Sequence, residues 1–242
     1  MTQASAPSRS LEKIRRLAAA PPAKGRAGAL ATLAMDVKYD RALLLGDVVL
    51  VRDVMDTIRA VRAAAGAGRA RTESTLMGVL ESLILSASLE EKPAAHRKSA
   101  REMWAFGLES LAFRHHRDST VWQRHQQAYA LLTAAALGVA AAEVLALARR
   151  ALRSEQEVDV EGGLQLLDEC VHRRGGDPGR ALVRELEAVL RRTRVRSNLV
   201  GALGLLVRLG AWDEFGALTT VEDWDEQQER RARREWASRQ RP

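Results

Sequence analysis

Apolar residues recur every three or four positions in one short segment after another, and glycine or proline interrupts the pattern between segments. Val51, Val54, Met55 and Ile58 show this spacing, which places their side chains on one face of an α-helix. The run VVLV at 48–51 would also suit a strand, but no second strand candidate follows to pair with it. The sequence therefore predicts a chain of helices without a β-sheet.

Residues that start or stop helices divide the chain further. Pro93 suits the first turn of a helix, Gly138 interrupts one, and Gly210 stands at a turn. Other helix starts are expected where a capping side chain or an acidic first turn precedes an apolar segment: Asp47, Thr72 or Ser74, Asp118 or Ser119, Asp177 before Pro178, Ser197, and Thr220 with Asp223. Together these signals predict about nine to eleven helices joined by short turns.

The composition supports the same fold class. Aromatic residues make up only 4% of the chain, so Leu, Val and Ala must fill the core, and Leu and Ala favour helices. We predict an all-α protein of stacked antiparallel helical hairpins, either α-solenoid-like or a compact multi-helix bundle. Residues 1–9 are expected to form a flexible tail, residues 10–220 a single helical-hairpin domain, and residues 221–242 a charged C-terminal helix that could act as a docking arm.

The stretch 199–215 resembles part of a tetratricopeptide repeat. Gly210 stands at the turn, and Trp212 stands where that family places an aromatic residue. Leu203 and Phe215 depart from the pattern, because the family has small residues at those positions. The resemblance covers less than one repeat and implies stacking of helical hairpins.

Residues 131–153, LLTAAALGVAAAEVLALARRALR, have the spacing of a helix-turn-helix, with Ala134, Gly138 and Val144 at its small, turn and apolar positions. A DNA-reading second helix needs polar side chains that reach the base edges. Here the second helix begins with three alanines followed by Glu143, which repels phosphate. We therefore expect two helices that meet at a glycine turn.

The net charge of +7 attracts anionic partners; residues 1–30 carry +5, and two further basic zones, 92–130 and 180–220, flank an acidic one. Residues 92–130 hold seven basic and three acidic side chains, and residues 180–220 hold seven and four. If the protein binds nucleic acid, arginines and lysines in these zones would contact phosphates while aromatic rings and histidines stack on bases. The candidate residues are Arg97, Lys98, Arg101, Arg114, His115, His116, Arg117, Trp122, Arg124, Arg191, Arg192, Arg194 and Arg196. The alternative is that these are solvated helix ends.

No pattern of residues predicts catalysis, a cofactor or a metal site. His115 and His116 are adjacent and point about 100° apart on a helix, so they do not readily share one ion. There is no paired CxxC, no HExxH, no phosphate-binding glycine loop and no nucleophile elbow. Cys170 fits a small buried residue better than a nucleophile. We expect no catalytic residues, no cofactor and no metal.

These observations favour a non-catalytic interaction or scaffold protein that binds another macromolecule, most simply a protein. The alternative is a nucleic-acid-binding protein that grips the phosphate backbone without reading sequence, and the third reading is a helical enzyme without a recognisable motif. The single cysteine and the lack of a secretory signal or a bilayer-spanning segment predict a cytoplasmic protein that does not enter a membrane. Self-association into a homo-oligomer is left open.

Overall fold

A computed structural model of the chain describes residues 16, 48–63, 68–88, 93–114, 120–174 and 179–239. Those residues form nine α-helices, one short 3₁₀ helix and no strand, so the predicted all-α fold of stacked helices is confirmed. The elements are α4 Val48–Ala63, α5 Arg69–Ser88, α6 Pro93–Ala112, α7 Val121–Ala135, η1 Ala136–Gly138, α8 Ala141–Leu152, α9 Glu157–Arg174, α10 Gly179–Arg192, α11 Arg196–Arg208 and α12 Glu214–Arg239. The expected tail at 1–9 lies outside the described residues.

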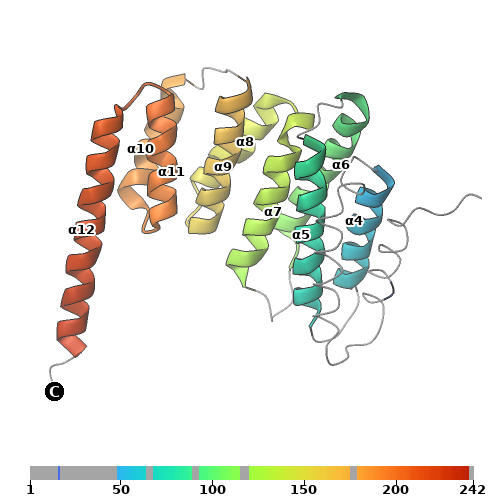
Figure 1. Cartoon of the computed structure of the whole chain (residues 1–242), viewed down its shortest axis with the longest axis horizontal. Helices are drawn as coiled ribbons and strands as arrows, with labels where there is room; N and C mark the ends of the chain where they lie inside the picture. The colour runs from blue at the N-terminus through green and yellow to red at the C-terminus, as the bar shows by residue number, and fades with distance from the viewer. Residues whose placement is uncertain are drawn as a thin grey trace, which may run out of the picture. The chain divides into compact units, whose positions relative to one another are not determined.

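The chain divides into two compact units, residues 1–146 and residues 147–242. In unit 1, α4 packs on α5 and α6 packs on α7 as two hairpins (Figure 1). Two charged pairs join α4 to α6, Arg52 to Glu102 with a 2.7 Å hydrogen bond and Arg59 to Glu109 with a 2.9 Å ion pair. Both pairs connect residues 50 positions apart, so α4 and α6 run parallel and in register, as the first helices of two stacked hairpins should.

The core of unit 1 is mostly aliphatic and includes one buried charged pair. Phe106, Leu131 and Leu132 are fully buried between α6 and α7. Arg62 of α4 is also buried, and its Nε lies 2.9 Å from a carboxylate oxygen of Glu73 on α5. This pair joins the end of α4 to the start of α5, which fixes the hairpin as antiparallel.

In unit 2, parallel alternate helices are again joined by side chains. Asn198 of α11 donates to the Glu157 carboxylate of α9 at 2.8 Å, and the guanidinium of Arg208 pairs with Asp168. These links span 41 and 40 positions. Arg149 of α8 donates two 2.9 Å hydrogen bonds to Glu185 of α10, 36 positions away. Helices α8 and α10 therefore form one parallel pair, and α9 and α11 form the other.

The structure corrects several predicted helix starts. Helix α5 begins at Arg69, so Thr72 and Ser74 lie inside it and the Thr72 hydroxyl donates back to the carbonyl of Gly68. Thr120, one position beyond the predicted candidates, caps α7 through a 3.2 Å bond from the Gln123 N–H. Asp47, Asp118, Ser119, Asp177 and Pro178 lie outside the described residues.

The predicted starts of the last two helices are also wrong. Helix α11 begins at Arg196 after Val195, so Ser197 is already helical. The start expected near Thr220 falls inside α12, which is continuous from Glu214, and Asp213 accepts the Gly216 N–H at 2.8 Å at the helix N-terminus. The positions predicted from proline and glycine are confirmed: α6 begins at Pro93, η1 ends at Gly138, and Gly210 adopts φ +64° at the turn before α12.

Among the described residues, no helix combines the length and the apolar character needed to cross a lipid bilayer.

Candidate docking surface

The structure separates the basic residues of zone 92–130 into two groups. Arg97, Lys98 and Arg101 lie in the first half of α6, where the Arg101 guanidinium donates to the carbonyl of Gly138 at 3.3 Å. Arg114 follows the far end of α6. At 1.5 Å per helical residue, Arg101 and Arg114 are roughly 20 Å apart along the axis. The zone is therefore not a single basic patch; the side chains of Arg97 and Lys98 lie outside the described residues.

The second group lies around the start of α7. Arg114 is exposed, Trp122 is 40% exposed and Val121 is 45% exposed, while Arg124 is half-buried and has an interaction within the chain. The Trp122 ring is therefore accessible at the start of α7. His115, His116 and Arg117 lie outside the described residues.

In zone 180–220, half of the predicted arginines have structural roles. Arg192 donates to the carbonyl of Ser154 at 2.6 Å and to that of Leu152, so its guanidinium caps the C-terminus of α8. Arg196 pairs with Asp225 at 3.0 Å, which ties the start of α11 to α12. The side chains of Arg191 and Arg194 remain exposed in the same segment. Arg191 and Arg194 are therefore the two of these four arginines whose side chains face solvent.

The loop that carries these arginines is held by a carboxylate from another helix. Glu157, in the first turn of α9, accepts the main-chain N–H of Arg194 at 2.7 Å and the hydroxyl of Thr193 and the amide of Asn198 at 2.8 Å each. Burial raises the pKa of the Glu157 carboxyl, but these hydrogen bonds and the charge of Arg192 outweigh burial and leave the pKa below its usual value. Glu157 is therefore ionised at neutral pH and holds the segment that leads into α11.

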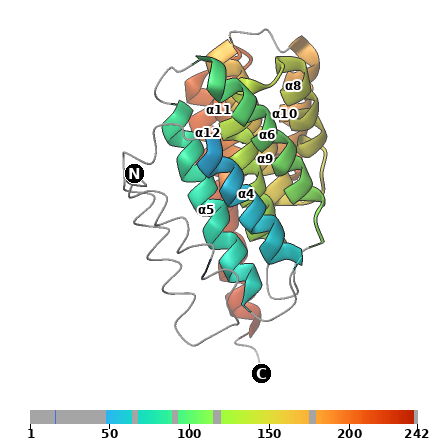
Figure 2. The same cartoon turned by 90° about the vertical axis from the view of Figure 1, so that its right-hand side faces the viewer.

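Helix α12 is twice as long as the helix it packs on. It has 26 residues, about 39 Å, whereas α11 has 13, about 20 Å. Ala217, Val221, Trp224 and Gln228 are half-buried and recur along one face, and every described side chain beyond Gln228 is exposed. Figures 1 and 2 both show the C-terminal part of α12 running past the ends of α10 and α11. Residues 229–239 are called the α12 arm below.

The charges of the middle of α12 are sorted along its length. From Glu222 to Arg234 the acidic residues come first and the arginines follow in a group of four within five positions. The members are Glu222, Asp223, Asp225, Glu226 and Glu229, then Arg230, Arg231, Arg233 and Arg234, and Glu235 and Arg239 follow this stretch. Glu226 pairs with Arg230 at 2.6 Å and Glu229 pairs with Arg233 at 2.5 Å, each four positions apart with the acid first, the order that best supports an isolated helix. Within this helix a negative segment thus precedes a positive one.

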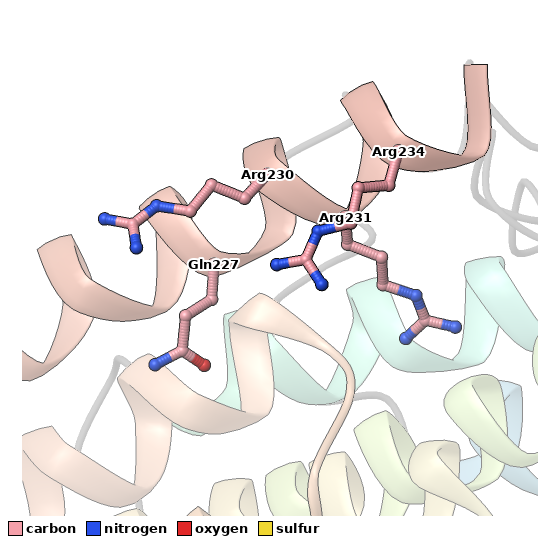
Figure 3. Close-up of a pocket in the computed structure, with 4 residues that line it drawn as sticks. All are labelled: Gln227, Arg230, Arg231 and Arg234. Atoms are coloured by element: carbon pink, nitrogen blue, oxygen red, sulfur yellow. The ribbon is translucent and has the colours of Figure 1, made fainter. Parts of the chain in front are cut away.

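One face of this region is hollowed. Gln227, Arg230, Arg231 and Arg234 line a depression, and Figure 3 shows their side chains extending from successive turns of α12. All four residues are exposed. The predicted set of binding residues omitted them, although the charged helix itself was expected as a docking arm. The run RRARR at 230–234 could have indicated a basic surface. That its side chains are exposed beyond the part of α12 that packs on α11 is visible only in the structure.

Titratable clusters are scarce elsewhere in the described chain. No group of three or more His, Cys, Asp or Glu residues that could hold a metal ion occurs among the described residues.

The three alanines at 140–142, at the start of the second helix of the helix-turn-helix candidate, are exposed, and Glu143 accepts the indole N–H of Trp104 at 2.9 Å. That carboxylate therefore joins α8 to α6 within unit 1.

Comparison of the chain with protein-family models, with curated proteins and with solved structures gives no match.

Proposed function

We propose that this chain is a non-catalytic interaction protein whose stacked hairpins hold the α12 arm out as a docking element for another macromolecule. The observation that carries the proposal is the exposure of every described side chain beyond Gln228 on a helix that continues to Arg239. A helical segment whose described side chains are all charged and exposed gains little stability from burial. Such a segment is more useful as a binding surface than as part of a core.

The accessible charges favour a partner with acidic groups on its surface. Arg230, Arg231 and Arg234 present three guanidiniums beside one depression, and guanidiniums bind carboxylates and phosphates in a bidentate manner. The single cysteine fits action in a reducing cytoplasm.

Site-specific photo-crosslinking tests the docking role. A photoreactive residue placed at Arg231 should give adducts with a bound macromolecule, whereas the same residue at the exposed Arg71 of α5 should give none, because that position lies in unit 1 and is not part of α12. Mass spectrometry identifies the adduct. Equal adducts from both positions, or none from Arg231 in extract of the source cell, would contradict the proposal.

A second candidate function is binding of a nucleic-acid backbone, which is favoured by the four arginines between 230 and 234 and by the exposed side chains of Arg191 and Arg194. Fluorescence anisotropy of a labelled random duplex and a single strand, titrated across a salt series, measures it. Binding whose logarithm falls linearly with the logarithm of salt concentration supports phosphate contacts. No binding at low salt removes this candidate and leaves a protein partner.

A further inference from the structure

Four residues of α12 form a continuous exposed stripe that has the spacing of a helix-pairing seam. They are Asp223, Gln227, Arg230 and Arg234, separated by four, three and four positions, and all are exposed. Positions separated in this way lie along one side of a helix and are the ones that face a second helix in a two-stranded pair. The depression of Figure 3 lies along the same stripe. These four residues are called the seam below.

The seam is complementary to itself in one arrangement. It begins with a carboxylate and ends with a guanidinium, and its spacing reads the same in both directions. Two antiparallel copies, related by a two-fold axis between Gln228 and Glu229, would place Asp223 opposite Arg234 of the second copy and Gln227 opposite Arg230 of the second copy. A two-fold axis repeats each contact, so the pair contains two Asp–Arg contacts. A parallel arrangement would instead oppose like charges.

Most of the other charged residues in this part of α12 already form ion pairs within the chain. Asp225 pairs with Arg196, Glu226 with Arg230, and Glu229 with Arg233. Among the described residues, no ion pair engages Asp223 or Arg234, although both are exposed and their spacing of 11 positions places them on the same side of α12. Arg230 keeps donors for the second copy because a guanidinium has five and its bond to Glu226 uses one.

We infer that the seam binds the seam of a second copy of this chain, so that two α12 helices pair antiparallel. The inference rests on the proposal that α12 is a docking element and names its occupant. Because the contacts are exposed ion pairs and hydrogen bonds rather than apolar contacts, the dimer is weak, forms best at low ionic strength and dissociates as salt screens the pairs.

Charge exchange tests the pairing. Sedimentation equilibrium of the full chain at low salt should show dimer formation that increases with concentration. Asp223→Arg and Arg234→Asp, made singly, each oppose like charges twice and should raise the dissociation constant about tenfold or more, a difference of about 1.4 kcal/mol. The double variant Asp223→Arg/Arg234→Asp restores opposite charges and should restore dimerisation. Arg191→Asp, which changes an exposed arginine outside α12, is the matched control and should dimerise like the unaltered chain.

The outcomes separate this inference from the proposed function. A chain that stays monomeric at every concentration, or a double variant that fails to recover while its helix content by circular dichroism is unchanged, overturns self-pairing. If the crosslinker at Arg231 then still captures a different macromolecule, the docking role stands with another occupant. If it captures only a second copy of the chain, the two results agree. If it captures nothing and no dimer forms, both proposals fail.

Discussion

Arg62 and Glu73 form an ion pair inside unit 1, with side chains only 3% and 5% exposed. The Arg62 guanidinium also donates to the hydroxyl of Ser110 at 2.9 Å and lies about 5 Å from the ring centroids of Phe106 and Phe113. One arginine of α4 thus contacts α5, α6 and the residue that follows α6. Burying a charge this far from water is costly, and these neighbours offset part of that cost.

Replacing Arg62 with methionine should destabilise unit 1 by about 3–5 kcal/mol, because it leaves the Glu73 carboxylate buried beside an apolar side chain. The double variant Arg62→Met/Glu73→Leu should recover much of that loss, since no buried charge remains. Urea unfolding followed by circular dichroism measures both. Arg52→Ala is the control: its pair with Glu102 is exposed and its loss should be far smaller. Equal effects of Arg62→Met and Arg52→Ala would contradict this account.

Glu157 should make unit 2 less stable in acid. Its pKa in the folded chain lies below its ordinary value near 4.3. Its stabilising contribution is therefore complete above that value and is lost as the pH falls through the lower folded pKa. Glu157→Gln should lower the unfolding midpoint at neutral pH, and the difference from the unaltered chain should shrink towards acid pH.

Glu161, one turn further along α9, should have the opposite effect on how stability depends on pH. Burial raises its pKa, and among the described residues its Oε2 atom has no hydrogen-bond partner. The ionised form is therefore unfavourable in the folded chain, and stability is lost as the pH rises through the folded pKa. Glu161→Gln should raise the unfolding midpoint at neutral pH and change it little in acid. The same pH dependence for Glu157→Gln and Glu161→Gln would show that the two environments are wrongly assigned.

Gly163 should not tolerate a methyl group. A Cβ atom there would lie 3.0 Å from the carbonyl oxygen of Ala148 and 3.0 Å from the main-chain nitrogen of Leu152, so α8 and α9 would have to separate. Gly163→Ala should lower the thermal unfolding midpoint of unit 2. Gly204 in α11 is the matched glycine, because nothing lies within 4 Å of its added Cβ. Gly204→Ala should stabilise by about 0.5–1 kcal/mol through helix propensity alone. An unchanged unfolding midpoint for Gly163→Ala would contradict the close approach of α8 and α9.

Replacing Arg192 should lower stability more than replacing its neighbour Arg191, although both side chains are exposed. Arg192→Ala removes the donors that cap Leu152 and Ser154, at a cost of about 1 kcal/mol, whereas Arg191→Ala should leave the unfolding midpoint unchanged. Differential scanning calorimetry of the two variants checks this. A larger loss for Arg191→Ala would mean that the α8 terminus does not depend on Arg192.

The sequence predicted helix identity well because each helix carries its own apolar periodicity and several have local stop signals. Pro93, Gly138 and Gly210 mark the ends correctly, since their backbone preferences act on their own position. Ser197 does not cap α11, because the helix already begins at Arg196 after Val195. The segment before the helix is held by Glu157, 37 positions before Arg194, and no local pattern reveals that contact.

The two predicted binding zones were less successful because charge counts ignore what each guanidinium already binds. Arg192 and Arg196 looked like free cations in the run RRTRVR, yet the first caps α8 and the second pairs with Asp225. The break expected at Thr220 is absent because its hydroxyl donates to the carbonyl of Gly216 inside a continuous helix. Whether Arg114, Trp122, Arg191 and Arg194 bind a ligand stays a prediction.

Among the described residues, the side-chain links seen between the helices of unit 2 join residues 29 to 41 positions apart, from Arg196 with Asp225 to Asn198 with Glu157. Closing loops of that length costs little chain entropy, and low contact order is associated with fast folding. During synthesis, α10 can dock on α8 and α11 on α9 as soon as each emerges, without waiting for residues far downstream. Unit 2 should therefore assemble in the order of its sequence, with α12 added last.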